Sequence, residues 1–133
     1  MKISLEHVGL PAADATALRN WYERVLGARL LWDNGQTPPT CLLALGDGAW
    51  LEIYPANAET NSTRADNKLA GFRHLALRVD SLDAAKAVLE QRGVTFTEEV
   101  RPAAGGGKVL FFADPEGNLL HFVERLPVGL NKS

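Results

Sequence analysis

The sequence lacks several features that mark secreted, membrane-spanning and nucleic-acid-binding proteins. Cys41 is the only cysteine, so no disulfide can form within the chain, and we expect a reducing, cytoplasmic compartment. No apolar run approaches the roughly 20 residues that cross a bilayer, and Glu6 stands where a signal peptide would need its apolar segment. The 14 basic and 16 acidic residues give a formal net charge of −2. That balance provides no basic surface for nucleic acid or an anionic membrane.

One order of predicted elements occurs twice along this chain of 133 residues, a length that fits one domain. In the first half, a strand over Leu5–Leu10 precedes a helix that Asp14 can cap and Gly27 can end. The apolar residues between them recur at helical spacing. Three more strands are expected, over 28–32, 41–45 and 49–54, with a tight hairpin at 46–48.

The second half repeats the plan. A strand over 72–77 precedes a helix that Ser81 can cap and Gly93 can end. Three strands follow over 94–97, 109–113 and 119–123, the last two joined by a reversal at 114–118. The sequence thus predicts an α+β domain over 1–125. Its two tandem βαβββ modules span about 1–56 and 72–125, with a polar linker at 57–71 and a tail at 126–133.

The three histidines of the chain and one glutamate occupy matching positions in the two halves. His7 and His74 stand third in the opening strands, and Glu52 and His121 lie on the closing strands. Because side chains alternate across a strand, a module that folds the same way twice would place these donors equivalently. Imidazole nitrogen and carboxylate oxygen are suitable ligands for zinc, iron(II), nickel, cobalt or manganese. The joint pattern predicts a divalent metal site.

Taken singly, each residue has a simpler interpretation. A histidine in an apolar strand is more often a hydrogen-bonded core or rim residue, and Glu52 could be the outward residue of an edge strand. The aromatic residues that could line a cavity are also typical of core packing; they are Trp32, Trp50 and Phe111. Arg73 and Arg101 could pair with an acidic substrate or be solvated.

With these features the chain resembles the vicinal oxygen chelate superfamily, which includes glyoxalase I, bleomycin resistance proteins and extradiol dioxygenases. The resemblance covers Met1 to about Arg125. Its markers are three of these strand residues (His7, Glu52 and His74), the helix end at 21–27 and the reversal at 114–118. It implies a curved mixed sheet built from paired modules, and a metal whose open positions chelate two neighbouring oxygens of a substrate. His7, Glu52 and His74 match the family's ligand positions.

Two departures bear on the reaction. Glyoxalase I usually has glutamate where this chain has His121, and histidine differs as a base, with an ordinary pKa near 6.5 rather than about 4.3. Glu52 is then the only carboxylate of the four, and we take Glu52 and His121 as the candidate catalytic residues. Pro11 and Ala56 occupy the places where glyoxalase I has an arginine and an asparagine, which argues against glutathione as the substrate carrier.

We therefore expect a metal-dependent lyase or isomerase of glyoxalase type that acts on a small oxygenated compound. One alternative is a non-haem iron dioxygenase, because two histidines and a carboxylate form an iron(II)-binding set. Another is a protein that binds a drug or metabolite without turnover, against which the four retained donors count. The resemblance also implies a homodimer in which His7 and Glu52 of one chain meet His74 and His121 of the other. A site closed within one chain remains the alternative.

Overall fold

The computed structural model describes residues 1–58 and 64–127. The chain divides into two compact units, Met1–Asn61 and Ser62–Ser133. Among the described residues, each unit contains one helix and one four-stranded mixed sheet, which confirms the predicted α+β fold with two βαβββ modules. Of the predicted linker and tail, residues 59–63 and 128–133 lie outside the described residues. No helix in the described part is long and apolar enough to cross a membrane.

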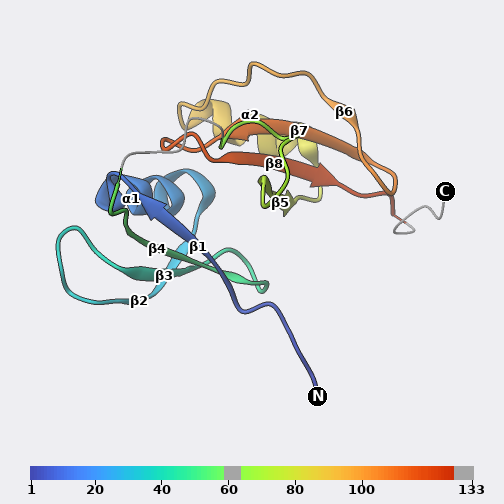
Figure 1. Cartoon of the computed structure of the whole chain (residues 1–133). Coiled ribbons are helices and arrows are strands. Elements are labelled where there is room, and N and C mark those ends of the chain that lie inside the picture. Colours follow the sequence, from blue (N-terminus) through green and yellow to red (C-terminus); the bar gives the residue numbers. More distant parts are fainter. Residues whose placement is uncertain (59–63, 128–133) are drawn as a thin grey trace. The chain divides into compact units, whose positions relative to one another are not determined.

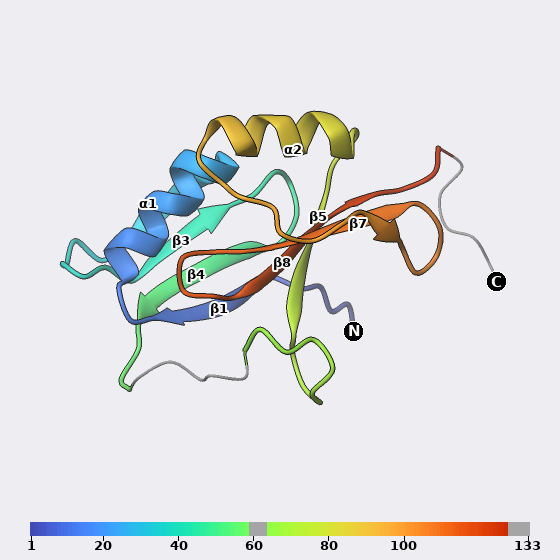
Figure 2. The ribbon, with the colours of Figure 1, turned by 90° about the horizontal axis from the view of Figure 1, so that it is seen from above.

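The first sheet has the strand order β1-β4-β3-β2. Strands β1 and β4 run parallel, and the other neighbouring pairs are antiparallel (Figure 2). The chain therefore returns to its first strand at the end of the module, and β1 is left at the edge of its sheet. The elements are β1 (His7–Ala12), α1 (Ala15–Leu26), β2 (Arg29–Asp33), β3 (Cys41–Ala44) and β4 (Trp50–Pro55).

Helix α1 begins and ends where the sequence predicts. Asp14 accepts a hydrogen bond from the amide of Ala17, and Gly27 closes the helix with a φ of +69°, a conformation that glycine adopts at little cost. The apolar stripe of α1 is fully buried at Leu18, Tyr22 and Val25. It packs against β4 and β1, so the helix covers one face of the first sheet (Figure 1).

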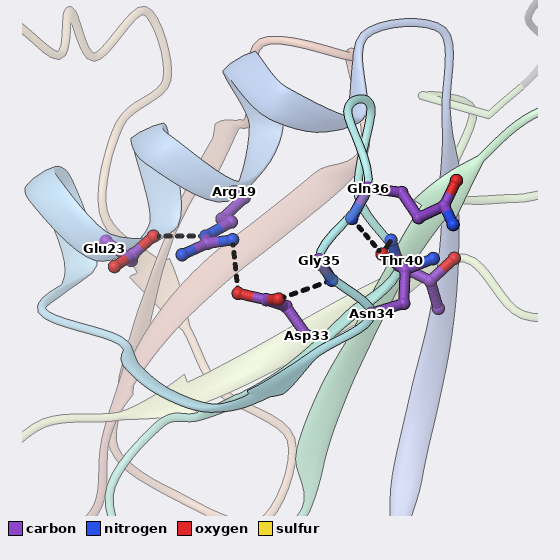
Figure 3. Close-up of polar contacts among 7 residues, drawn as sticks. All are labelled: Arg19, Glu23, Asp33, Asn34, Gly35, Gln36 and Thr40. Atoms are coloured by element: carbon purple, nitrogen blue, oxygen red, sulfur yellow. Dashed lines mark hydrogen bonds and ion pairs between the residues drawn. The ribbon is translucent and has the colours of Figure 1, made fainter.

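Arg19 ties α1 to the end of β2 (Figure 3). Its Nε donates to Glu23 at 2.9 Å and its Nη1 to Asp33 at 3.3 Å. The loop that follows is ordered by Asn34, whose side-chain oxygen accepts from the amides of Gln36 and Thr40, each at 3.1 Å. The side chains of Arg19 and Asp33 thus have structural roles, and the hydrogen bonds of Asn34 stabilise the loop that leads into β3.

The second sheet repeats the topology in the order β5-β8-β7-β6, again with its first and last strands parallel. Ser81 caps α2 by accepting from the amide of Ala84, as predicted, and Glu124 adds a second cap by accepting from the amide of Leu82 at 2.8 Å. The helix ends at Gln91, two residues before Gly93. The elements are β5 (His74–Arg78), α2 (Leu82–Gln91), β6 (Arg101–Pro102), β7 (Lys108–Ala113) and β8 (Leu119–Glu124).

The strand predicted over 94–97 is wrong. Those residues form no strand, and the third strand of the module is instead β6, which is only two residues long. The apolar signal at Phe96 has another cause, because its ring packs 5.6 Å from that of Phe112. The Phe96 side chain is thus partly buried, although its backbone is not part of a strand. Pro102, which has no amide hydrogen, limits how far β6 can extend its ladder with β7.

Candidate functional site

Strands β1 and β4 bring His7 and Glu52 together. In the parallel register Gly9 stands opposite Glu52, so His7 and Glu52 share a face of the sheet. Leu51 and Ile53 point to the other face, where they are buried beneath α1. The Nε2 atom of His7 lies 3.9 Å from Oε1 of Glu52, and both side chains are about one-third exposed, at 39% and 34%. The first unit therefore presents this predicted pair on the sheet face away from its helix.

Strands β5 and β8 bring His74 and His121 together in the same way. His121 pairs with Ala76 across the ladder, which places it on the same face as His74. The two imidazole ring centroids are 4.7 Å apart. Phe111 of β7 lies beside them, with its ring centroid 4.7 Å from that of His121 and 5.7 Å from that of His74. His121 is buried and His74 is exposed.

All three histidines use their Nδ1 atom in a hydrogen bond. The partners are the carboxylate of Glu6 for His7, at 3.0 Å, and the side-chain oxygen of Asn67 for His74, at 2.7 Å. His121 bonds to the backbone carbonyl of Phe122 at 3.1 Å. Because these partners are acceptors, Nδ1 carries the proton in each neutral ring, and the lone pair is on Nε2. This is the arrangement in which histidines bind metals, with the second nitrogen held by an acceptor.

The environment of His121 favours its neutral form. Burial lowers the pKa of this ring below its ordinary value. The hydrogen bond to the carbonyl of Phe122 opposes the shift, and electrostatic interactions with His74, Arg125 and Arg101 add to the lowering. A ring with a lowered pKa is unprotonated at pH 7, so protons do not compete with a metal for Nε2.

Each unit gathers two of the four predicted donors. Within the described residues, no group of three or more histidine, cysteine, aspartate or glutamate side chains forms inside either unit. Structural and catalytic zinc sites use at least three protein ligands. Neither pair therefore meets this number within its own unit.

Several residues around the donors were not found from the sequence. Glu6 and Asn67 orient two of the histidine rings, as described above. Tyr54, two residues after Glu52, lies against Gly9, where a Cβ atom would come within 3.2 Å of the tyrosine hydroxyl oxygen. A glycine inside a strand is typical of such a close approach, so Gly9 was the available signal. The acceptors of the histidines left no comparable pattern.

The turn before β8 is fixed by a buried carboxylate. Asp114 is only 5% exposed, and its Oδ1 accepts from the amides of Glu116 and Asn118 at 2.9 and 3.0 Å. Its Oδ2 accepts from the side-chain amide of Asn118 at 2.9 Å. The reversal predicted at 114–118 is confirmed, and its bonds hold the start of the strand that carries His121.

Comparison with known proteins agrees with this architecture. The model of the Glyoxalase/Bleomycin resistance protein/Dioxygenase superfamily matches residues 4–122. The chain belongs to this superfamily. Integron cassette protein VCH_CASS1, from the mobile metagenome of V. cholerae, is 31% identical, with a TM-score of 0.68 over 93% of this chain and 97% of that one.

Two other solved structures with this fold are an antibiotic-binding protein and a fosfomycin resistance protein. TnmS3, an antibiotic-binding protein from Streptomyces sp. CB03234, is 26% identical, with a TM-score of 0.71 over 95% of this chain and 99% of that one. A variant of the fosfomycin resistance protein FosX from Listeria monocytogenes is 17% identical, with a TM-score of 0.69 over 96% of this chain and 94% of that one. That structure contains Mn(II) and 1S,2S-dihydroxypropylphosphonic acid. Members of the fold thus include a metal-containing resistance protein and an antibiotic-binding protein.

Proposed function

We propose that the protein binds a divalent metal through His7, Glu52, His74 and His121 and acts as a lyase or isomerase on a small oxygenated compound. The observation that carries this proposal is that the Nδ1 atom of all three histidines is hydrogen-bonded to an acceptor. Each ring donates a hydrogen bond from Nδ1 to an acceptor, which leaves the lone pair of Nε2 for a metal.

The chemistry of the donors fits a first-row metal. Nitrogen and oxygen ligands bind such ions at roughly 2.0–2.2 Å, so two donors 3.9 Å apart, as in His7 and Glu52, are within reach of one ion. Three imidazoles and one carboxylate suit zinc, iron(II), nickel, cobalt or manganese. The presence of Mn(II) in FosX, which has the same fold, supports this range.

The proposed reaction assigns separate tasks to the side chains. A bound metal would supply Lewis-acid polarisation of two neighbouring substrate oxygens. Glu52 is the only carboxylate of the four donors, and we assign it the transfer of a proton between adjacent substrate carbons. His121, which is buried and neutral, holds its lone pair for the metal and contributes to the catalytic centre in that role.

We also propose that the site is shared in a homodimer. Each unit supplies two donors, fewer than a metal site requires. In a twofold dimer, His7 and Glu52 of one chain would meet His74 and His121 of the partner, which gives two equivalent sites. The alternative, in which both pairs of one chain close a site, uses the same four residues.

Metal analysis of the purified protein tests the proposal first. Wild-type protein should hold zinc, nickel, cobalt, manganese or iron, and His7→Ala and His74→Ala should each lose most of it. Glu52→Gln should weaken metal binding and abolish turnover, whereas the exposed Glu90→Gln on α2 is the matched control and should retain both. Full metal occupancy in both histidine variants would refute the assignment. Iron together with oxygen uptake would favour a dioxygenase.

A second candidate function is the binding of an aromatic drug without turnover. Trp32, Leu42 and Glu52 are neighbours across the first sheet, and Trp50 and Tyr54 flank Glu52 on that face. Trp32 is 52% exposed, which leaves its ring available for stacking. The likeness to TnmS3 supports this candidate. Fluorescence titration with aromatic antibiotics tests it: tight binding by protein stripped of metal, with no product formed, would favour it over the enzyme.

A further inference from the structure

Arg101 lies on the same face of the second sheet as the histidine pair. Phe111 stands opposite His121 in the ladder between β7 and β8, and Val109, two residues earlier on β7, stands opposite Arg101 of β6. Since residues two apart on a strand share a face, the side chains of this face run from His121 through Phe111 to Arg101. Helix α2 lies on the other face, because its first turn is capped by Glu124, whose position in β8 alternates with that of Val123.

The guanidinium of Arg101 rests on the ring of Phe111. Its Cζ atom lies 4.8 Å from the ring centroid, which is a cation–π contact. The centroid of the same ring is 4.7 Å from that of the His121 imidazole. Arg101 and His121 are therefore both neighbours of Phe111. The Arg101 charge is also close enough to contribute to the lowered pKa of His121.

The N–H groups of Arg101 are available to a ligand. No hydrogen bond joins its guanidinium to another described residue, and its ion pair with Glu98 is loose, at 3.8 Å between two side chains that are each 56% exposed. Arg125 differs, because its Nη1 donates to the carbonyls of Ala104 and Gly106. Stacking on Phe111 therefore orients the Arg101 fork while leaving its donors toward solvent.

We propose that Arg101 binds an oxyanion group of the substrate, a carboxylate or phosphoryl group separate from the oxygens that chelate the metal. This inference rests on the proposed metal site. A guanidinium offers two parallel N–H donors that match such a group, and the apolar ring beneath it reduces competition by water. The exposed Glu98 is displaced by the stronger pairing. The substrate class is thus narrowed to small oxygenated compounds with an anionic group beyond the chelating end.

Two hydroxy acids test this assignment on the cobalt(II)-loaded protein. Lactate and malate can each chelate a metal through a hydroxyl and its neighbouring carboxylate, and malate has one more carboxylate. Binding is followed by the visible absorption of cobalt. In wild-type protein malate should bind more tightly than lactate. Arg101→Met should weaken malate binding about tenfold or more, the scale of a lost charge-assisted hydrogen bond, and leave lactate unchanged.

The controls separate charge from fold. Lys86→Met removes a positive charge from α2, on the other face of the same sheet, and should leave both affinities unchanged. Arg101→Lys keeps the charge and should recover only part of the preference for malate. Raising the salt concentration should reduce the preference in wild-type protein. Equal affinities of wild-type protein for the two acids, or equal losses of both in Arg101→Met, would overturn the Arg101 assignment and leave the metal site standing. Failure to bind cobalt at all would overturn the proposed function, and this inference with it.

Discussion

At each histidine, one hydrogen bond decides which ring nitrogen can bind a metal. Asn67 provides the shortest of these bonds, 2.7 Å from Nδ1 of His74. Glu6 does the same for His7 from the neighbouring position in the chain, and the backbone does it for His121. Such acceptors fix the ring orientation and raise its basicity. We therefore expect the affinity for a metal to depend also on residues that would not touch it.

Asn67→Ala should weaken metal binding by about 10- to 100-fold, the usual cost of losing a histidine's acceptor. The measurement is competition with a chelator of known affinity. Asn20→Ala, an exposed asparagine on α1, is the matched control and should have no effect. An unchanged affinity in Asn67→Ala would show that the His74 bond does not prepare the ring for metal.

The stability of the metal-free protein should depend on pH through His121. Its folded-state pKa is lowered by burial, so the unfolded chain binds the proton more readily. The folded state therefore loses stability when His121 must be protonated. This loss is absent above the pKa of histidine in the unfolded chain, near 6.5, and grows as the pH falls from there toward the pKa in the folded state. Urea midpoints at about pH 7.5 and pH 5.5 should differ more for wild-type protein than for His121→Gln. An equal pH response of the two proteins would contradict the burial argument.

At the scale of elements, tight turns hold the strands that carry the donors. Gly107 joins β6 to β7 with a φ of +95°, and a Cβ atom there would lie 2.0 Å from the backbone oxygen of Glu124. Both the backbone angle and the close approach require glycine. The loop is held further by Arg125, which donates to the carbonyls of Ala104 and Gly106.

Gly107→Ala should lower the free energy of unfolding by at least about 1–3 kcal/mol, the range for a residue forced into a disfavoured backbone region. Chemical denaturation measures it. Gly48→Ala, in the hairpin between β3 and β4, is the control, because a Cβ atom there meets nothing within 4 Å and no positive φ is involved. Similar losses in the two variants would remove the special role of Gly107.

The local signals in the sequence predicted the elements well where one residue determines a boundary. Asp14 and Ser81 cap their helices and Gly27 ends the first, each by a bond or angle that only a few residue types provide. The strand predicted over 94–97 was wrong because Phe96 is apolar for another reason, the packing of its partly buried ring against Phe112. The acceptor role of Asn67 could not be predicted, since its place beside His74 depends on the path of an irregular segment.

At the scale of the whole molecule, the duplicated module gives two pairs of candidate donors that are alike in position and different in chemistry. The first unit offers an imidazole and a carboxylate, and the second offers two imidazoles next to an aromatic ring. Repetition in the sequence was sufficient to predict which strands carry the four candidate residues. It could not indicate whether the proposed site would join the two pairs of one chain or pairs from two chains, because both arrangements use the same four residues.

The most direct test of the central claim is the metal content of a mixture of two inactive variants. His7→Ala and His121→Ala should each bind little metal alone. If the sites are shared in a dimer, random subunit exchange in an equal mixture produces heterodimers with one doubly altered site and one intact site. About one quarter of the wild-type metal sites should then return, together with a proportionate part of the activity. No recovery of metal binding, despite demonstrated exchange of subunits, would contradict the shared four-residue site.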